Sequence, residues 1–503
     1  MPDLRSLVAG VLAPGFNGTS VPEWLRAAVD DGLGSVVLFG HNVSAPDHDP
    51  DVPLRQLAAL CTELRGRRTD LLIASDEEGG DVTRMEVGAG SSLPGAAALG
   101  AIGDAGFTAE VAAAHGGLLR ALGIDSGLAP VADVNSNPAN PVIGVRSFGP
   151  DATTVAAQVV AYTEGLQSAG VLACVKHFPG HGDAGVDSHH ELPKLLATID
   201  ELRRRELVPF AAAVRAGVAA VMPGHLMVPA VDQLAASVSQ RWTGILRGEL
   251  AFAGLIITDA LDMRAVADRY GVPGAAVMAL RAGADLLCLG NTAGIDDEQM
   301  YTDCVEAILA AVADGTVRPE ALTGAARRRR QAMAGLASSA HPAAGEAAPV
   351  DGIAAAAAEL RRIGRRAAEL AIRVDPALRI GAAPAVVDLR MGGNTAAGPT
   401  SRRLPDALRA GWPGMVMIDH ADRAAFAARI TAMNRPVLVL VRSAAEGSAE
   451  GARLHQILQL RPDSVVVHTG WPGTPSGPRT VFSYGEAAVN ARVLCERLSG
   501  PAG

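Results

Sequence analysis

Residues 170–183 read Gly-Val-Leu-Ala-Cys-Val-Lys-His-Phe-Pro-Gly-His-Gly-Asp, and Asp187-Ser188-His189-His190 follows shortly afterwards. The stretch begins with an apolar run and passes abruptly into lysine, histidine and aspartate. This pattern indicates a buried strand that opens into an active-site loop. The sequence therefore favours an enzyme.

The run at 170–175 is one of eight short apolar runs before about residue 290 that predict strands. They lie near Val8–Ala13, Ser35–Phe39, Leu71–Ser75, Gly127–Ala132, Val171–Val175, Val218–Met222, Leu255–Thr258 and Ala284–Leu289. Segments with helical periodicity lie between them, including Pro22–Asp31, Pro53–Arg65, Ala109–Leu122, Thr153–Ala169, Thr198–Ala216 and Met263–Ala282. The alternation predicts parallel strands with crossover helices, and eight such units favour a closed (β/α)8 barrel of the TIM type over an open sheet.

Polar residues follow five of the predicted strands at the point where each strand ends. They are Asp76, Asp133, Lys176 with His177, His225 and Asp259. In a barrel the carboxyl ends of all strands meet on one face, so residues remote in sequence become neighbours. Any one of them could instead be a helix cap or a solvated side chain, but five in register favour an active site on that face.

The composition changes near residue 338, where the Ser/Ala/Pro-rich segment Ser338–Gly345 predicts an exposed linker. A long helix is predicted at Ile353–Ile372 and a last helix at Ala487–Leu498. Strands are predicted between them at Ala385–Leu389, Met415–Ile418, Val437–Val441 and Ser464–His468. We therefore expect a catalytic barrel (1–337), a linker (338–352) and a smaller C-terminal α/β sandwich domain (353–503) with a largely parallel sheet.

The composition excludes several classes of protein. The 503 residues carry a net charge of −9, which argues against nucleic acid or an anionic membrane surface as the main partner. The five cysteines are odd in number and form no Cys-x-x-Cys pair, which suits a reducing compartment. We find no signal peptide and no uncharged apolar stretch of membrane-spanning length, so we expect a cytoplasmic protein, either a monomer or a homodimer.

Asp259 ends the apolar run Leu255–Thr258 and is the first candidate for chemistry. A carboxylate held at the mouth of a strand can act as a nucleophile or stabilise a cationic centre. It could instead cap the helix that starts near Leu261, because aspartate favours N-cap positions. Asp262 is the neighbouring alternative, one turn further into that helix.

Asp187 and His189 form the second candidate. An aspartate and a histidine two residues apart in a loop can hydrogen-bond, which fixes the tautomer of the imidazole and raises its basicity. Such a histidine can act as a general acid and then as a base. His190 is the alternative, and the motif also suits a solvated turn. The histidines and aspartates of residues 177–190 suit zinc by type, but no His-Glu-x-x-His motif or cysteine pair accompanies them, so no metal or other cofactor is predicted.

A third group has the chemistry to grip a polyhydroxylated ligand such as a sugar. Carboxylates in Asp76-Glu77-Glu78-Gly79-Gly80 can accept hydroxyl hydrogen bonds, and the glycines let backbone approach a ligand closely. Arg146 offers a planar donor fork, and Lys176 and His177 add further donors. Each could instead belong to a structural ion pair, and we favour that role for Glu77 and Glu78.

With these residues, the chain resembles the family 3 glycoside hydrolases, specifically the bacterial two-domain β-N-acetylglucosaminidase (β-hexosaminidase) branch. The matching motifs run in family order between about residues 10 and 335. They are Ser75–Gly80, Asn140–Gly149, Lys176–Asp183 with Asp187–His189, Pro223–His225 and Ile257–Asp259. Two positions depart from the family pattern: Glu77 stands where relatives often have glutamine, and Asp81 where they usually have arginine.

The resemblance implies a role for each of these residues. Asp259 would be the nucleophile that forms a covalent glycosyl intermediate, and His189 would be the general acid/base, oriented by Asp187. The sugar pocket would contain Asp76, Asp133, Arg146, Lys176, His177 and His225.

The expected activity is that of a retaining exo-β-N-acetylglucosaminidase acting on cell-wall fragments or chitooligosaccharides that end in N-acetylglucosamine (GlcNAc). An imidazole acid/base does not repel an anionic acceptor as a carboxylate would, so a phosphorylase is an alternative. A β-glucosidase-like relative is another. A catalytically inactive sugar-binding protein is disfavoured because Asp187, His189 and Asp259 are all present.

Overall fold

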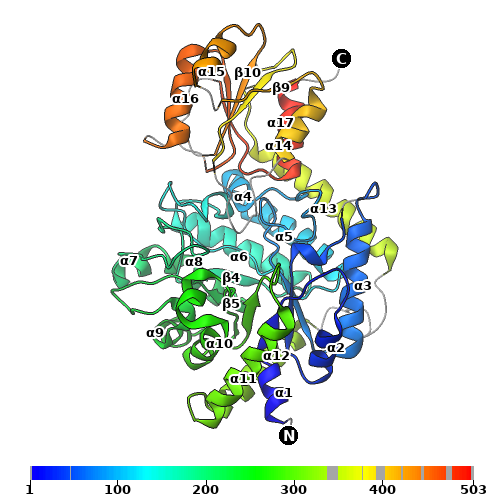
Figure 1. The fold of residues 1–503 in the computed structure, drawn as a ribbon, viewed down its shortest axis with the longest axis vertical. Helices are drawn as coiled ribbons and strands as arrows, with labels where there is room; N and C mark the ends of the chain where they lie inside the picture. The colour runs from blue at the N-terminus through cyan, green and yellow to red at the C-terminus, as the bar shows by residue number, and fades with distance from the viewer. Residues whose placement is uncertain are drawn as a thin grey trace.

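The computed structural model describes residues 3–45, 47–336, 349–375, 378–391, 403–420, 423–442, 444, 447–471 and 479–499. In Figure 1 the residues up to 336 build the larger lower part of the molecule, and a five-stranded sheet with its helices forms the smaller upper part. Helix α13 (Val350–Ala371) packs along the larger part against α5. It begins three residues before the predicted start at Ile353, and residues 338–348 of the predicted linker lie outside the described residues.

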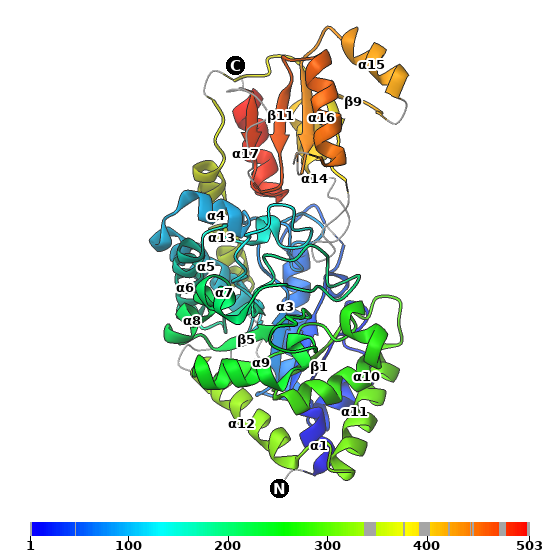
Figure 2. The same cartoon turned by 90° about the vertical axis from the view of Figure 1, so that its left-hand side faces the viewer.

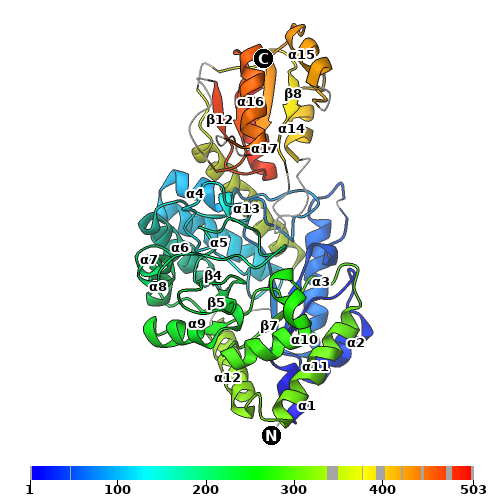
Figure 3. The same ribbon diagram turned by 60° about the vertical axis from the view of Figure 1, so that its left-hand side comes forward.

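Seven short strands form the centre of the larger part: β1 (Leu12–Pro14), β2 (Ser35–Leu38), β3 (Leu72–Ser75), β4 (Cys174–Phe178), β5 (Ala220–Pro223), β6 (Leu255–Ile256) and β7 (Leu287–Gly290). They form three parallel sheets, β1-β7, β2-β3 and β4-β5-β6. Isolated parallel bridges join these sheets: Ala74 with Ser126, Ser126 with Leu172, and Ile257 with Leu286. Helices surround the strands in Figure 3, so the predicted α/β architecture with parallel strands is confirmed.

Twelve helices of the larger part are described: α1 (Leu4–Ala9), α2 (Glu23–Asp30), α3 (Val52–Arg67), α4 (Ala96–Ile102), α5 (Ala105–Ala121), α6 (Ala152–Ser168), α7 (Ile199–Arg204), α8 (Leu207–Arg215), α9 (Gln240–Gly244), α10 (Arg264–Ala282), α11 (Asp297–Ala313) and α12 (Pro319–Leu336). The segment 198–216, predicted as one helix, is two. Pro209 has no N–H to donate to the carbonyl of Arg205, and its ring would clash with that carbonyl in a continuous helix.

Two predicted strands differ in the structure. Residues 127–132 carry an isolated bridge at Val131 instead of a strand. Pro130 cannot donate to a ladder, and Leu128 adopts a positive φ of 45°, so regular pairing is interrupted there. The start of the predicted first strand, Val8–Ala9, belongs to α1.

The strands of the larger part have two buried faces, because successive side chains point to opposite sides. One face contributes to a single cluster that includes Leu72, Ala74, Cys174, Met222, Ile257 and Cys288. The other face packs with the helices through residues such as Ile73, Val175, Val221, Ile256 and Leu287. Polar side chains are therefore confined to the ends of the strands, and the carboxyl ends carry the candidate site.

The C-terminal sheet has the order β12-β11-β10-β8-β9, and all its pairs are parallel. Its strands are β8 (Ala385–Asp388), β9 (Val416–Met417), β10 (Val437–Val441), β11 (Val465–His468) and β12 (Thr480–Phe482). Helices α14 (Arg403–Gly411) and α17 (Ala488–Ser499) pack on one face, and α15 (Arg423–Thr431) and α16 (Ala449–Leu460) on the other. Figure 2 shows α17 and α16 on opposite sides of β11. Strand β12 was not predicted.

Candidate active site

A cavity opens at the carboxyl ends of the strands in the larger part. Its polar wall consists of Asp76, Arg146, Lys176, His177, His181, Ser188, His189 and Asp259. Its apolar wall includes Phe39, Ile143, Met222 and Met263. The polar residues follow or end strands that are far apart in sequence, so the parallel topology brings them together.

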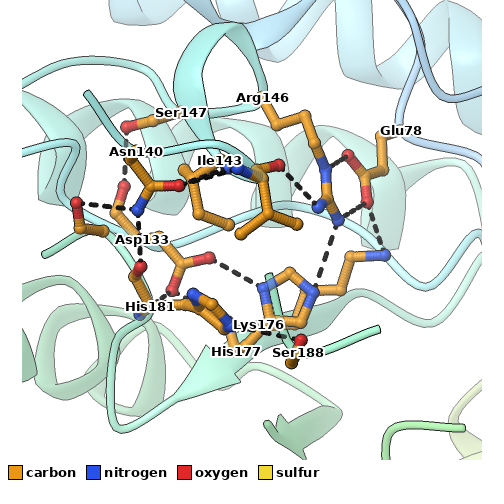
Figure 4. Close-up of polar contacts among 12 residues, drawn as sticks. Glu78, Asp133, Asn140, Ile143, Arg146, Ser147, Lys176, His177, His181 and Ser188 are labelled. Carbon is orange, nitrogen blue, oxygen red and sulfur yellow. Dashed lines mark hydrogen bonds and ion pairs between the residues drawn. The ribbon is translucent and has the colours of Figure 1, made fainter. Parts of the chain in front are cut away.

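Asp76 and Glu78 share the buried ammonium group of Lys176. Lys176 Nζ contacts an oxygen of Asp76 and lies 2.6 Å from Glu78 Oε1. Arg84 donates to Asp76 Oδ2 at 3.0 Å. Arg146 donates to both oxygens of Glu78 at 2.7 and 2.9 Å (Figure 4). Burial tends to raise the pKa of both carboxyls, but the neighbouring cations hold these pKa values below their usual range. The cluster is therefore ionised at neutral pH.

Asp76 is the member of this cluster that a ligand reaches most easily. Its side chain is 22% exposed, whereas those of Lys176 and Glu78 are 2% and 6% exposed. Burial opposes the charge on Lys176, yet the two carboxylates raise the pKa of its ammonium group. Glu78, which is itself held by Arg146, thus binds Lys176, and the favoured ion-pair role of Glu78 agrees with this geometry.

Asp133 fixes the imidazole of His177 from behind the cavity wall. Its Oδ2 lies 2.7 Å from His177 Nδ1, and its Oδ1 accepts the backbone N–H groups of His177 and His181. The carboxylate can only accept, so Nδ1 of His177 donates and Nε2 is left for Arg146, 3.4 Å away. Asp133 is fully buried, yet the neighbouring histidines keep its pKa below the usual range. Figure 4 shows Asp133 and His177 facing each other.

Asp187 and His189 form a direct pair in the loop after β4. Asp187 Oδ1 lies 2.6 Å from His189 Nδ1 and also accepts the backbone N–H of His189 at 2.9 Å. The side chain of Asp187 is 8% exposed and that of His189 is 26% exposed. Since Nδ1 is committed to the carboxylate, Nε2 is the nitrogen available for proton transfer.

His181 connects the start of this loop with the Asp187–His189 pair. Its Nε2 lies 3.2 Å from the hydroxyl of Ser188, which stands between Asp187 and His189. Burial lowers the pKa of His181 to about 4, so the ring is neutral at physiological pH. Sequence reasoning considered His181 only among metal-type donors and assigned no role to Ser188. The position of Ser188 inside the Asp-x-His motif was the one signal for it.

Asp259 lies where the chain leaves β6, and its Oδ1 accepts the backbone N–H of Ala260 at 2.9 Å. Burial tends to raise its pKa, but the imidazoles of His225 and His177 bring it below the usual value. Asp262, the alternative, does not line the cavity. Burial raises its pKa to about 6, and its Oδ2 accepts the backbone N–H of Asn291. The two carboxyls are thus distinguished by their position and by the direction in which their pKa values are shifted.

His225 supports the segment that carries Asp259. Its Nε2 donates to the carbonyl of Ala260 at 2.8 Å, so its Nδ1 accepts from the hydroxyl of Ser237 at 2.6 Å. Burial lowers the pKa of His225. Like Asp133 and Asp187, His225 does not line the cavity. Six of the nine predicted site residues thus line the cavity, and these three stand behind it.

The geometry places a carboxylate and a carboxylate-paired imidazole on one cavity wall beside a charged cluster. Residues 19–331 match the family model of the glycosyl hydrolase family 3 N terminal domain. The chain belongs to glycosyl hydrolase family 3. As the resemblance of its motifs implied, the protein is a glycoside hydrolase.

Individual relatives agree with this family. A β-hexosaminidase of Methylococcus capsulatus is 38% identical over 262 residues, which cover 52% of this chain and 76% of that protein. The structure of a family 3 β-N-acetylglucosaminidase from Paenibacillus sp. FPU-7 is 31% identical, with a TM-score of 0.81 and coverage of 100% of this chain and 97% of that one. A fungal multi-domain β-N-acetylglucosaminidase is 26% identical, with a TM-score of 0.87, and the match covers 99% of this chain but 59% of the fungal one.

Three further observations concern the described part of this glycoside hydrolase. No helix within it combines the length and the apolar character needed to cross a membrane. Within the same residues, no group of three or more histidine, cysteine, aspartate or glutamate side chains is arranged to hold a metal ion. Its cysteines are all free and buried.

Proposed function

We propose that this glycoside hydrolase is a retaining exo-β-N-acetylglucosaminidase that releases terminal β-linked GlcNAc from cell-wall fragments or chitooligosaccharides. The observation that carries the proposal is that Asp259 and the Asp187-paired His189 line the same cavity. The β-hexosaminidase and β-N-acetylglucosaminidase relatives support the choice of sugar. The proposed route uses no metal or organic cofactor.

In the first step, a carboxylate oxygen of Asp259 attacks the anomeric carbon while the bond to the leaving oxygen breaks. Protonated Nε2 of His189 gives its proton to that oxygen, and the aglycone leaves as an alcohol. In the second step, neutral Nε2 removes a proton from water, whose oxygen attacks the same carbon and displaces the Asp259 carboxylate. Two displacements retain the anomeric configuration. Asp187 stabilises the imidazolium and fixes its orientation throughout.

The remaining predicted residues divide into two roles in this proposal. Those that line the cavity bind the sugar hydroxyls: Asp76, Arg146, Lys176 and His177. Asp133 and His225 act as positioning residues, because they contact His177 and Ala260 from behind the wall. Asp76 is the principal acceptor, since it is the most exposed member of its ion-pair cluster.

Phosphorolysis is the second candidate, and the charge of the cavity favours it. Asp76 and Asp259 are the carboxylates among the described lining residues. Asp76 is neutralised by Lys176 and Arg84, and Asp259 is esterified in the intermediate. A phosphate that approaches beside His189 therefore meets no unpaired carboxylate on this wall, and its attack would give GlcNAc 1-phosphate.

Assays of p-nitrophenyl β-GlcNAc and β-glucoside, with and without phosphate, test the sugar and the acceptor together. GlcNAc and GlcNAc 1-phosphate are separated chromatographically, and NMR records the anomer formed first. A 5-fluoro GlcNAc fluoride should label Asp259, as identified by peptide mass spectrometry. Inversion of configuration, or a label on a different residue, would refute the mechanism. Preference for the glucoside would instead support the β-glucosidase-like alternative.

For the fold, we propose that the strands of the larger part form one closed barrel and that the C-terminal sheet belongs to a separate domain. The first proposal is supported by the bridges between sheets and by a hydrogen bond from Gly34 N–H to the carbonyl of Ala9, just before β2 and β1. The second is supported by the separate apolar clusters of the C-terminal sheet. The domain limits, the cytoplasmic location and the choice between monomer and homodimer stay predictions.

A further inference from the structure

The loop between β3 and α4, residues 76–95, carries Asp76, Glu78 and Arg84 of the charged cluster. We call it the gripping loop. Its inner side binds Lys176 and faces the cavity. Its outer side contacts the chain beyond residue 360, which has no role in the chemistry proposed above.

Among the described residues, two side-chain hydrogen bonds hold the outer side of the gripping loop, beside a backbone bond of 3.4 Å from Val489 N–H to the carbonyl of Ser91. Asp81 Oδ1 accepts the backbone N–H of Glu486 at 2.6 Å. Arg403, at the start of α14, donates from Nη2 to the carbonyl of Val87 at 2.7 Å. In each contact a side chain pairs with a backbone group of the other segment, so the loop is anchored at two points, at Asp81 and at Val87.

Close packing adds to these contacts. A Cβ atom added at Gly364 of α13 would lie 1.9 Å from the carbonyl oxygen of Ser92, so only glycine lets the helix and the loop approach this closely. A Cβ added at Gly90 would lie 2.9 Å from the Cβ of Ala488, and Gly90 has a positive φ of 85°. The loop backbone therefore rests directly on α13 and α17.

The anchor at Asp81 lies in a short turn between the functional residues of the loop. The N–H of Glu78 bonds to the carbonyl of Val82 across this turn. Glu77 Oε2 accepts hydrogen bonds from the backbone N–H groups of Arg84 and Met85. These bonds connect the residue before the turn to the residues after it. A displacement of Asp81 therefore moves Glu78 and Arg84 together, and with them the environment of Asp76.

We propose that the C-terminal part of the chain holds the gripping loop in its substrate-binding position, with Asp81 and Arg403 as the positioning residues. This gives a function to the C-terminal part and explains what aspartate does at position 81. The inference rests on the proposed function in that the loop binds the sugar; the anchoring itself is independent of the substrate.

The test compares Asp81→Ala and Arg403→Ala with two matched controls in the full-length protein. Asp81→Asn keeps an acceptor oxygen for the Glu486 N–H. Arg366→Ala removes a contact between α13 and α5, the 4.0 Å ion pair with Glu110, that does not involve the loop. Two quantities are measured: amide hydrogen exchange over residues 78–92, and kcat and KM for p-nitrophenyl β-GlcNAc.

In both alanine variants the amide hydrogens of the loop should exchange with solvent about tenfold faster. Their kcat/KM should fall about tenfold, mainly because KM rises. Asp81→Asn and Arg366→Ala should stay within about twofold of the wild type. Unchanged exchange in Asp81→Ala and Arg403→Ala would overturn the anchoring, whatever the substrate. Faster exchange with unchanged KM would overturn the link to binding. A wild type that cleaves no GlcNAc glycoside would defeat the proposed function, while the exchange data would still decide the anchoring.

Discussion

Asp187→Ala is the most direct test of the proposed catalytic pair, Asp187 and His189. Asp187 Oδ1 accepts two hydrogen bonds from His189, one from Nδ1 at 2.6 Å and one from the backbone N–H at 2.9 Å. A hydrogen bond to a charged group contributes roughly 1.5–3 kcal/mol. The Nδ1 bond strengthens as His189 becomes positively charged, so its loss should remove about 2 kcal/mol of stabilisation from the acid form, or about 30-fold in rate.

The loss should depend on the leaving group. The quantity to measure is kcat/KM for chitobiose and for 2,4-dinitrophenyl β-GlcNAc. It reports the steps up to formation of the glycosyl intermediate. Chitobiose needs a proton on its leaving oxygen and should lose about 30-fold, whereas the dinitrophenolate needs none and should lose less than about threefold. Asp187→Asn, which keeps an acceptor oxygen without the charge, should lie between the alanine variant and the wild type.

A double-mutant cycle of Asp187 and His189 tests whether Asp187 acts through His189. If Asp187 acts through His189, Asp187→Ala should have almost no further effect in a His189→Ala background. Equal losses on both substrates, or additive losses in the cycle, would show that Asp187 does not act by supporting an acid at His189.

Three further predictions concern other buried carboxyls. Asp259→Asn should lower turnover of the aryl glycoside at least about 1,000-fold while the Kd for GlcNAc, measured by calorimetry, stays near wild type; a loss below about tenfold would rule out a nucleophile. Burial raises the pKa of Glu77 from 4.5 to about 7, so its protonated form is favoured in the folded state and stability is lost as pH rises through this range. Urea unfolding should therefore show Glu77→Gln gaining roughly 2 kcal/mol relative to wild type between pH 5 and pH 8, and no change would contradict the raised pKa. Asp285→Ala should lower the free energy of unfolding by about 3 kcal/mol, because Asp285 accepts the Ile256 N–H and pairs with Arg247 and Arg328, while KM should not change.

The apolar runs predicted most of the strands because their burial is a local property of the sequence. The exceptions have local chemical causes as well. Pro130 removes a donor from the run at 127–132, and Pro209 divides the segment at 198–216. Both prolines can be seen in the sequence, but a prediction based on hydrophobic periodicity alone does not take their missing N–H groups into account. Strand β12 has only three residues, of which Val481 is fully buried, so it left little apolar signal.

The site was predictable to the extent that each residue follows a strand. Asp76, Lys176, His177 and Asp259 line the cavity for this reason. Sequence position does not tell which polar residue stands behind another, because that depends on side-chain direction across different elements. Asp133 is directed to His177, so it does not line the cavity although it follows a predicted strand in the same way.

The carboxylates at the two ends of the strands differ in what their oxygens contact. Asp125 and Asp285 precede strand segments and are fully buried. Their oxygens accept hydrogen bonds from backbone N–H groups and pair with arginines. Neither side chain has an exposed surface that a ligand could contact, so the hydrogen bonds and ion pairs of these carboxylates stabilise the folded protein. Asp76 and Asp259 follow strands, and both keep a surface on the cavity. The desolvation of the carboxylates is thus offset entirely within the protein at one end of the strands, whereas at the other end partly exposed carboxylates are left to interact with a substrate. A carboxylate at a carboxyl end is therefore the better candidate for chemistry, because part of its surface faces the cavity.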